Sequence, residues 1–288
     1  MRDYAGITKL TQTEIEEQYY SFDIDKKDGD QRSITAPMDD LKSIQQRILS
    51  LLTKVQRPDW LMSAERGKSY ITNGQAHLNS DYLLTMDIKK FYDNCKREYV
   101  YQFFIDIMKT SPDVSEILTN IVTVNGGIPT GCPTSQIIAY YAYQTMFLNI
   151  HAIAQKHNCI FTLYVDDMTF SSNEPFDPKR LMKDVEIELR KFGHRLKASK
   201  VKYYGRNRHK LVTGVALLKE HKLQIPNRLH KKIYTDAMKT KGMVVNQEIS
   251  KEFGFLKSLQ GRVQAARNVE PLIFPEIKRL VKRAIDMT

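Results

Sequence analysis

Three aspartates stand where apolar stretches of the sequence end. Asp166 and Asp167 interrupt the run FTLYVDDMTF (161–170), and Asp87 follows YLLTM (82–86). Burying an unpaired carboxylate is costly, but converging carboxylates can hold divalent cations such as Mg²⁺. Two such ions, roughly 4 Å apart, activate an attacking oxygen and neutralise a leaving one during displacement at phosphorus. The plainer alternatives are a solvated hairpin tip for the Asp pair and a helix cap for Asp87.

Five short motifs include or accompany these aspartates. They are SYITNGQAH (69–77), DIKKFYDN (87–94), GIPTGCPTSQ (127–136), YVDD (164–167) and KLVTG (210–214). In this order and spacing they resemble the reverse transcriptases, and within that family the bacterial retron type. The resemblance runs from about residue 26 to about residue 230. It implies a right-hand polymerase fold of the α+β class, with fingers, a palm that contains an antiparallel sheet, and a helical thumb.

The resemblance also implies roles for the residues that match the motifs. Asp87, Asp166 and Asp167 would form a catalytic triad that binds two Mg²⁺ ions, for which Mn²⁺ is the alternative ion. The backbone carbonyl of Ile88 is the implied additional metal ligand. Tyr92 falls at the position of the family's steric gate, which excludes a ribose 2′-hydroxyl and so favours dNTPs. The alternative is that Tyr92 is an ordinary core aromatic.

Further residues are implied to bind the incoming nucleotide. Arg32, Arg66 and Lys68 lie in the fingers region, where basic groups clamp a triphosphate. Gly131 would let the backbone approach the nucleotide and template closely, although a plain turn explains this glycine equally well. The remaining two are Thr130, which stands where many relatives have Gln, and Lys200, implied to act near the leaving pyrophosphate.

Charge is divided unevenly along the chain. Residues 179–288 hold 27 Lys and Arg against 10 Asp and Glu, whereas residues 1–178 hold 17 against 23. A basic C-terminal third favours a polyanionic partner, and the alternative is a solvated basic face that only promotes solubility. The resemblance implies that the partner is a cognate structured noncoding RNA. The residues expected to contact it are Val212, Thr213, Gly214, His230, Lys231, Lys232, Arg262, Lys278, Arg279, Lys282 and Arg283.

Periodicity and turn residues predict the elements that position these groups. Residues 1–25 are predicted as an N-terminal helical extension, followed by a hairpin that turns at Asp28–Gly29 and a helix that Asp39 caps. A single apolar helix is expected over 136–157, a strand pair over 159–172, and a helix over 177–192 that ends at Gly193. The predicted domains are fingers 26–86 with part of 95–135, palm 87–218, and a basic helical thumb 219–288. In 277–283 the stripe of Ile277, Leu280 and Val281 is expected to face the core.

No run of 18 apolar residues and no apolar segment near the N-terminus occurs, so neither a membrane span nor a signal peptide is expected. Three cysteines without CxxC spacing fit reduced thiols, and a cytoplasmic protein is predicted.

The sequence thus favours an RNA-directed DNA polymerase that copies part of a cognate noncoding RNA into DNA from dNTPs. The resemblance further implies a separate effector protein and a role in anti-phage defence. Two alternatives remain: another defence-associated reverse transcriptase with a different template, and a non-catalytic RNA-binding scaffold that keeps a relic palm.

Overall fold

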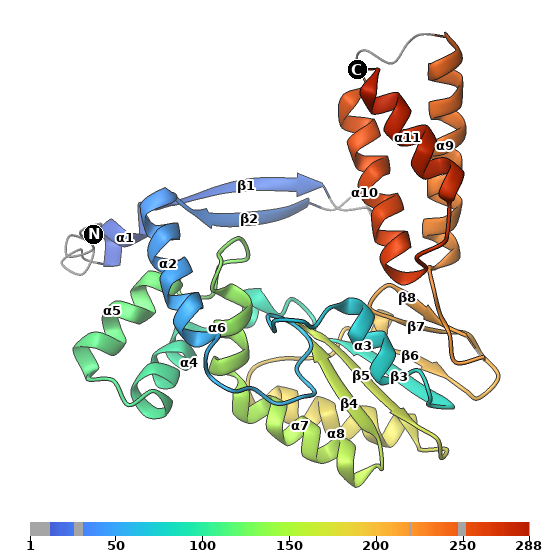
Figure 1. Ribbon diagram of the computed structural model, residues 1–288. Coiled ribbons are helices and arrows are strands. Elements are labelled where there is room, and N and C mark those ends of the chain that lie inside the picture. Colours follow the sequence, from blue (N-terminus) through green and yellow to red (C-terminus); the bar gives the residue numbers. More distant parts are fainter. Residues whose placement is uncertain (1–11, 26–30, 219, 247–251, 288) are drawn as a thin grey trace. The chain divides into compact units, whose positions relative to one another are not determined.

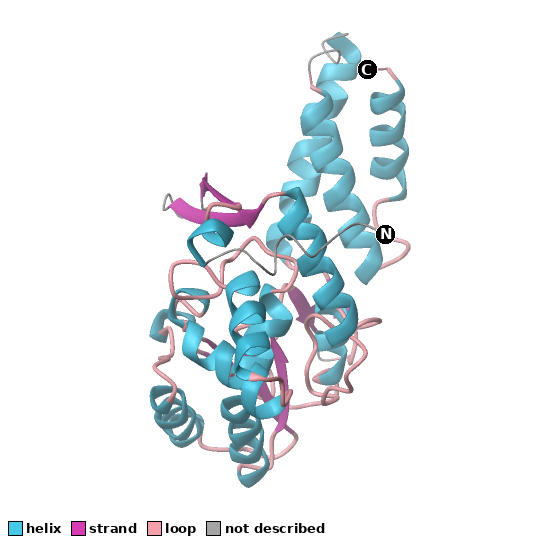
Figure 2. Cartoon of the chain, turned by 90° about the vertical axis from the view of Figure 1, so that its left-hand side faces the viewer, coloured by secondary structure: helices cyan, strands magenta, loops and turns pink. Residues whose placement is uncertain are grey.

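The computed structural model describes residues 12–25, 31–218, 220–246 and 252–287 of the 288-residue chain (Figure 1). Two compact units divide the chain. The larger unit comprises residues 1–68 and 84–203, and the smaller unit comprises residues 69–83 and 204–288. Helices make up most of the described chain, and the strands are short (Figure 2). This mixture without regular alternation confirms the α+β class. Among the described residues, no helix is long and apolar enough to cross a lipid bilayer.

The larger unit begins with a short helix and a two-stranded hairpin. Helix α1 spans Gln12–Glu16, and strands β1 (Tyr19–Asp25) and β2 (Gln31–Pro37) pair antiparallel. The prediction of a helical extension over 1–25 is therefore wrong for 19–25. The reason is that Tyr20, Phe22 and Ile24 alternate with polar residues, which is the period of a strand. The predicted Asp28–Gly29 turn lies outside the described residues.

Four helices and one π-helical turn lie before or after β3 (Tyr82–Asp87) along the chain. They are α2 (Asp39–Leu52), α4 (Arg97–Gln102), η3 (Phe103–Ile107), α5 (Pro112–Val122) and α6 (Ser135–Ala142). Asp39 is not the N-cap of α2, because Met38 holds that position and Asp39 is the first helical residue. There its carboxylate still lies near the positive end of the helix dipole.

The single apolar helix predicted over 136–157 is instead two helices, α6 and α7 (Gln144–Lys156). They are separated at Tyr143, whose backbone leaves the helical region at φ −112° and ψ 21°. The Tyr143 side chain is fully buried, and its hydroxyl accepts a hydrogen bond from the backbone of Lys96 (2.9 Å) and donates one to the carbonyl of Asn94 (3.1 Å). The break places this hydroxyl against two backbone groups of a distant segment.

Strands β4 (Ile160–Tyr164) and β5 (Asp167–Ser172) form the predicted strand pair, and they join β3 and β6 (Lys202–Tyr204) in a sheet of order β4-β5-β3-β6. Tyr164 pairs with Asp167, so Val165 and Asp166 are the two loop residues. Helix α8 (Pro178–Lys191) packs on α7. Its N-cap is Asp177, and Gly193 follows its end at φ +79°, as a helix-ending glycine does.

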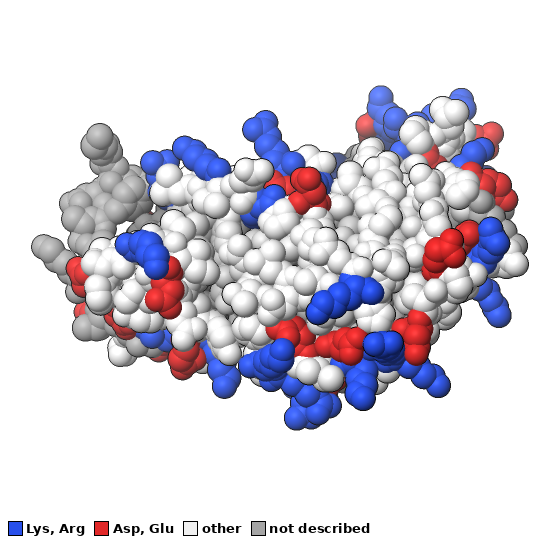
Figure 3. All heavy atoms as spheres, turned by 90° about the horizontal axis from the view of Figure 1, so that it is seen from below, with Lys and Arg blue, Asp and Glu red and all other residues white. Residues whose placement is uncertain are grey.

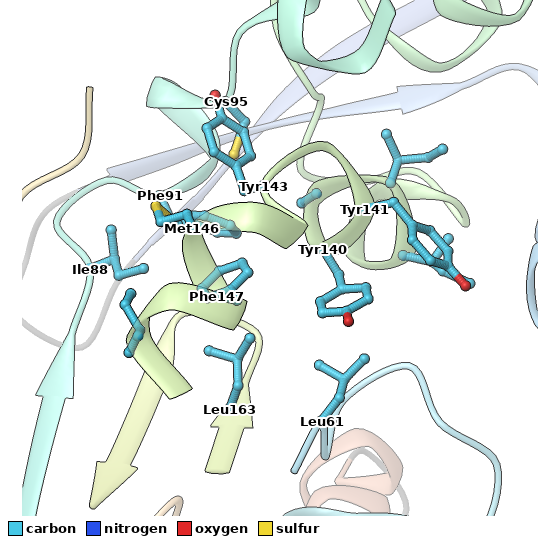
Figure 4. Close-up of a cluster of buried hydrophobic side chains, with 14 of the residues drawn as sticks. Leu61, Ile88, Phe91, Cys95, Tyr140, Tyr141, Tyr143, Met146, Phe147 and Leu163 are labelled. Atoms are coloured by element: carbon cyan, nitrogen blue, oxygen red, sulfur yellow. The ribbon is translucent and has the colours of Figure 1, made fainter. Parts of the chain in front are cut away.

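One large core holds the larger unit together. Figure 4 shows its centre, where Phe147 lies near Leu163 of β4 and Tyr140 lies near Leu61. Phe91 is 3% exposed, and Phe147 and Leu163 are 1% exposed or less. Because the aromatic side chains of 91, 143 and 147 interlock, the segment after β3 is fixed to α7.

The smaller unit combines a short helix, a three-stranded sheet and a helical bundle. These elements are α3 (Tyr70–Ala76), β7 (Lys210–Val212), β8 (Val215–Leu217), β9 (Leu223–Gln224), α9 (Asn227–Asn246), α10 (Phe253–Val269) and α11 (Pro275–Asp286). Ile233, Leu259 and Val281 form the centre of the bundle core. Ile277 and Leu280 are partly buried and Val281 is buried, which confirms the predicted inward stripe of α11.

We predict that Tyr143→Phe lowers the free energy of unfolding by about 1–2 kcal/mol, because two partly buried hydrogen bonds, to the N–H of Lys96 and the carbonyl of Asn94, are lost. Chemical denaturation monitored by circular dichroism measures the change. Tyr20→Phe removes a hydroxyl from a side chain that is 51% exposed, and this matched variant should change stability by less than about 0.5 kcal/mol. Equal effects of the two substitutions would contradict the role assigned to the Tyr143 hydroxyl.

Candidate active site

The three aspartates converge at one end of the four-stranded sheet. Asp87 is the last residue of β3, Asp167 is the first of β5, and these strands are neighbours. Asp166 lies in the loop just before Asp167, and its backbone carbonyl accepts a hydrogen bond from the N–H of Ile88 (3.2 Å). Asp87 is only 5% exposed. The fold therefore brings together the two places where the sequence ends an apolar strand with an acid.

The loop that carries Asp166 has an unusual backbone. Val165 adopts φ +60°, which is a genuine outlier for a β-branched residue. Its N–H donates to the side-chain oxygen of Ser63 (2.9 Å), and Ser63 is 7% exposed. The segment before Ser63 also runs beside β4, since Leu163 exchanges hydrogen bonds with the backbones of Trp60 (2.9 Å) and Met62 (2.8 Å). The segment at 60–63 thus holds the hairpin in its strained form.

Sequence reasoning missed Ser63. The only signal available was its position six residues before the SYITNGQAH motif, which says nothing about a contact 102 residues further along the chain.

Lys200 contacts the triad directly. It lies at the end of a short 3₁₀ turn, Ala198–Lys200, and its Nζ forms an ion pair with Oδ2 of Asp87. Partial burial is the largest influence on the pKa of Lys200 and lowers it. The hydrogen bond and charge of Asp87 together with the charges of Asp167 and Asp166 outweigh burial, so the pKa is raised overall. Lys200 stays a cation beside the carboxylates.

Crowding of negative charge is most evident at Asp167. Burial is the main cause that raises its pKa, and the neighbouring charges of Asp166 and Asp87 add to it, so the pKa reaches about 7. A carboxyl group with this pKa is partly protonated near neutral pH. A cation placed among the three carboxylates would remove the repulsion.

The donor atoms fit a hard divalent cation. Carboxylate and carbonyl oxygens are the ligands that Mg²⁺ prefers. The β-bridge between Ile88 and Leu196 consists of two hydrogen bonds. The N–H of Lys89 donates to the carbonyl of Arg195, and the N–H of Lys197 donates to the carbonyl of Asp87. The carbonyl of Ile88 therefore takes no part in this bridge. Within the described ranges, no three His, Cys, Asp or Glu side chains already stand at metal-ligand spacing. An ion held here would require the carboxylates to adjust, and it would compete with the ammonium of Lys200 at Asp87.

Tyr92 stands on a short 3₁₀ turn, Tyr92–Asn94, that follows the triad residue Asp87. Its ring lies 5.5 Å from that of Phe91 (centroid to centroid) and packs partly against the core. Burial is the main cause that raises the pKa of Tyr92, so the phenol stays protonated. Of the two adjacent aromatics, Phe91 is the core residue and Tyr92 is the one with a partly exposed face.

The loop that contains Thr130 and Gly131 lies along strand β2. The N–H of Gly131 donates to the carbonyl of Thr35 (2.9 Å), and a Cβ atom on Gly131 would lie 2.7 Å from that carbonyl oxygen. The hydroxyl of Thr130 lies 3.5 Å from the carbonyl of Ser33. The close approach that requires a glycine here is therefore to the hairpin backbone, a contact that the sequence did not reveal.

The three basic residues that the sequence assigned to triphosphate binding differ from one another. Arg66 is exposed, whereas the Nζ of Lys68 donates to the carbonyls of Asp59 (2.7 Å) and Leu61 (3.0 Å). Lys68 thus braces its own loop. Arg32 lies on β2 opposite Ile24, and its side chain is outside the described part of the structure.

In the smaller unit the VTG residues form a hairpin turn. Thr213 and Gly214 have φ values of +43° and +92°, and they connect the paired residues Val212 and Val215. The Thr213 hydroxyl donates to the carbonyl of Tyr70 (3.2 Å) and accepts from the side-chain amide of Asn73 (3.2 Å). The SYITNGQAH and KLVTG motifs therefore contact each other. Val212 is fully buried, so the prediction that its side chain contacts RNA is wrong.

Most of the predicted RNA-contacting residues of the helical bundle are exposed. They are His230, Lys231 and Lys232 on α9, and Lys278, Arg279, Lys282 and Arg283 on α11. Arg262 differs, because its guanidinium pairs with Asp236 (2.7 Å) and donates to the hydroxyl of Ser258 (2.6 Å). It joins α10 to α9 in this structure, and its assignment as an RNA contact stays a prediction. On the face that Figure 3 presents, basic and acidic side chains are interspersed and form no single basic area.

We predict that Asp167→Asn stabilises the metal-free protein at about pH 8 and has less effect at about pH 5. The pKa of Asp167 is raised from 3.8 to about 7 in the folded state, so the folded protein binds more protons than the unfolded chain in this window. Stability is therefore lost as the pH rises through it, and an amide avoids the loss. Thermal melts in a chelating buffer measure the effect, with roughly 2–4 °C expected for each kcal/mol.

Asp25→Asn provides the control for this series, because Asp25 is exposed on β1. It should leave the difference between the two pH values unchanged. A melt of Asp167→Asn that shifts equally at both would show that the carboxyl is not under electrostatic stress.

Comparison with known proteins shows the family. The family described as reverse transcriptase (RNA-dependent DNA polymerase) matches residues 24–245. The retron Se72 reverse transcriptase of Salmonella heidelberg is 29% identical over 56% of this chain and 43% of its own length. The retron Ec83 reverse transcriptase of Escherichia coli is 25% identical over 97% of this chain and 91% of its own.

Among solved structures, apo telomerase from Candida tropicalis matches with a TM-score of 0.55 and 14% identity. The match covers 72% of this chain and 47% of that one. At this identity the likeness shows the fold alone, which is the right-hand polymerase fold that the motifs predicted. Taken with the aspartates gathered at the ends of β3 and β4–β5, the family match establishes that the chain belongs to the reverse transcriptase family, and the similar relatives above are retron reverse transcriptases.

Proposed function

We propose that the chain is an RNA-directed DNA polymerase that copies part of a cognate structured noncoding RNA into DNA. The observation that carries the proposal is the convergence of Asp87, Asp166 and Asp167 at one end of the sheet, in a chain that belongs to the reverse transcriptase family. A scaffold without catalysis would have no reason to keep three mutually repelling acids together. The proposed domains are fingers 26–86 with part of 95–135, palm 87–218 and thumb 219–288.

In the proposed reaction, a primer hydroxyl attacks the α-phosphate of a bound dNTP and pyrophosphate leaves. For the first nucleotide of a retron product, the attacking group would be a 2′-hydroxyl of the RNA. Asp87, Asp166 and Asp167, with the carbonyl of Ile88, would hold two Mg²⁺ ions or Mn²⁺ in their place. When bound, these ions polarise the attacking oxygen and neutralise charge on the phosphates.

The other residues of the site bind and orient the nucleotide. The ammonium of Lys200 lies beside Asp87, and we propose that it moves to the leaving pyrophosphate when a metal ion replaces it at the carboxylate. The partly exposed face of Tyr92 would stack under the sugar and exclude a 2′-hydroxyl. Arg32, Arg66 and the Thr130–Gly131 loop would meet the triphosphate and base, and Lys68 would join them only after it leaves its backbone carbonyls.

The smaller unit is proposed to bind the RNA. Exposed basic side chains on α9 and α11 suit contacts to backbone phosphates, and the Thr213–Gly214 turn presents a rigid backbone. We propose Lys231, Lys282 and Arg283 among these contacts. Lys232 also has a partner within α9, because its Nζ lies 3.8 Å from Oδ2 of Asp236. A separate effector protein and a part in anti-phage defence in the cytoplasm rest on the resemblance to retrons alone.

We predict that the double variant Asp166→Asn/Asp167→Asn loses at least about 10³-fold in DNA synthesis, because the proposed metal ligands are gone. The assay combines purified protein, its co-purifying RNA, Mg²⁺ and labelled dNTPs, and sequencing of the product identifies the template. RNA should still co-purify with the variant. Unchanged synthesis would end the two-metal assignment, and product of unrelated sequence would favour another defence-associated enzyme.

We predict that Ser63→Ala lowers the rate of nucleotide addition by roughly tenfold, or about 1.4 kcal/mol in activation free energy, with little change in thermal stability. The substitution removes the acceptor for the N–H of Val165, so the strained loop that carries Asp166 is free to relax. Single-turnover kinetics measure the rate. Ser50→Ala, which alters an exposed hydroxyl on α2, should have no effect, and a Ser63 variant with the wild-type rate would show that the hairpin holds its own shape.

A further inference from the structure

The segment between Asp87 and Tyr92 makes a turn that its sequence does not favour. Lys90 adopts φ +49°, in the left-handed region that favours glycine. Lys90 is exposed, so packing of its own side chain does not impose this backbone. Something else must hold the turn, because a lysine at this φ loses free energy relative to an ordinary conformation.

Asn94 is the residue that holds it. Its side-chain amide donates to the carbonyls of Lys89 (3.1 Å) and Lys90 (2.9 Å). Its backbone N–H donates a hydrogen bond that is shared between the carbonyls of Lys90 (3.2 Å) and Phe91 (3.0 Å). One residue thus gathers the carbonyl oxygens of three consecutive residues, and these are the residues immediately before Tyr92.

Asn94 is in turn fixed to the core. Its own carbonyl accepts a hydrogen bond from the hydroxyl of Tyr143, which also binds the N–H of Lys96. Tyr143 is fully buried between α6 and α7. The turn is therefore tied to the helix break through Asn94, by hydrogen bonds that add to the packing of the Phe91 ring on Tyr143.

Packing of the Phe91 ring provides a second anchor for this segment. The Phe91 ring packs against Phe147 (6.1 Å between ring centroids) and His194 (5.2 Å). This anchor fixes the Phe91 side chain, but it does not set the direction of the backbone that leads from Lys90 into the 3₁₀ turn. Tyr92 begins that turn, and the N–H of Cys95 closes it on the Tyr92 carbonyl (3.0 Å).

We propose that Asn94 is a positioning residue that sets the height of the Tyr92 ring and so determines how strongly the site rejects ribonucleotides. The inference rests on the proposed function, in which Tyr92 meets the sugar. Without the two side-chain hydrogen bonds, the strained φ of Lys90 relaxes, the backbone before Tyr92 shifts, and the ring no longer closes the space beside the 2′ carbon. Deoxynucleotide addition itself needs the aspartates, which Asn94 does not contact through its side chain in the described structure.

The test is the ratio of kcat/KM for a ribonucleotide to that for the matching deoxynucleotide. Asn94→Asp has the same shape, but it offers no amide donor and places a carboxylate against two carbonyl oxygens. We expect the ratio to rise by about tenfold, a difference of about 1.4 kcal/mol. Should Asn94→Asp fail to fold, as judged by circular dichroism, Asn94→Ala removes the donor without adding a charge and gives the same comparison.

Lys90→Gly provides the matched rescue. Glycine adopts a φ near +49° without strain, so the turn should persist without Asn94. We expect Lys90→Gly alone to keep the wild-type ratio, and Lys90→Gly/Asn94→Asp to return the ratio to within about twofold of wild type. A residue that only supports the fold would not show this pattern, because it would lower both rates together.

Tyr92→Ala separates this inference from the function on which it rests. An unchanged ratio in Tyr92→Ala would overturn the gate assignment itself. A raised ratio in Tyr92→Ala with a wild-type ratio in Asn94→Asp would overturn the role of Asn94 and show that the packing of Phe91 is sufficient. A raised ratio in Asn94→Asp that Lys90→Gly fails to restore would overturn the proposed action through the turn.

Discussion

Repulsion among the carboxylates of Asp87, Asp166 and Asp167 is the constraint on which the rest of the larger unit depends. The sheet order places β5 beside β3, so the strand ends that carry these acids cannot separate without breaking the sheet. Burial is the main cause that raises the pKa of Asp167, and the charges of Asp166 and Asp87 raise it further. The ion pair of Asp87 with Lys200 compensates part of the repulsion. A site of this kind gains stability when cations bind, and this is the property that a two-metal nucleotidyl transferase requires.

The backbone on either side of the acids is strained and is held by side chains from other segments. Val165 precedes Asp166 at φ +60°, and Ser63 supports it; Lys90 follows Asp87 at φ +49°, and Asn94 supports it. Backbone strain persists only where the surroundings over-determine the conformation, and it concentrates at functional sites. The two supporting residues also differ in the segments that they connect. Ser63 couples the segment at 60–63 to the hairpin, whereas Asn94 couples the turn to the buried Tyr143 and to the break between α6 and α7.

Prediction from sequence succeeded where a local pattern was sufficient. Alternation and apolar runs located β3 and the β4–β5 pair, and the aspartates at the ends of these strands lie together in the structure. It failed where the outcome depended on distant partners. The apolar pattern continues through Tyr143, so nothing local marks the end of α6; the break is stabilised by hydrogen bonds to the segment at 94–96. Likewise, the sequence suggests that Arg262 is a surface cation, and only the fold shows that Asp236 lies beside it.

The motifs themselves show the same limit, because a resemblance does not say whether a residue touches a ligand or holds the residue that does. Thr213 and Asn73 belong to two motifs of the smaller unit, yet they hydrogen-bond to each other, and Val212 is buried beneath them. Their joint effect is to keep a threonine at φ +43°, where a β-branched residue is otherwise disfavoured. Within the proposed RNA-binding unit, the direct contacts are therefore assigned to the exposed cations of α9 and α11. Packing constrains the positions of these side chains least, so a motif predicts them least well.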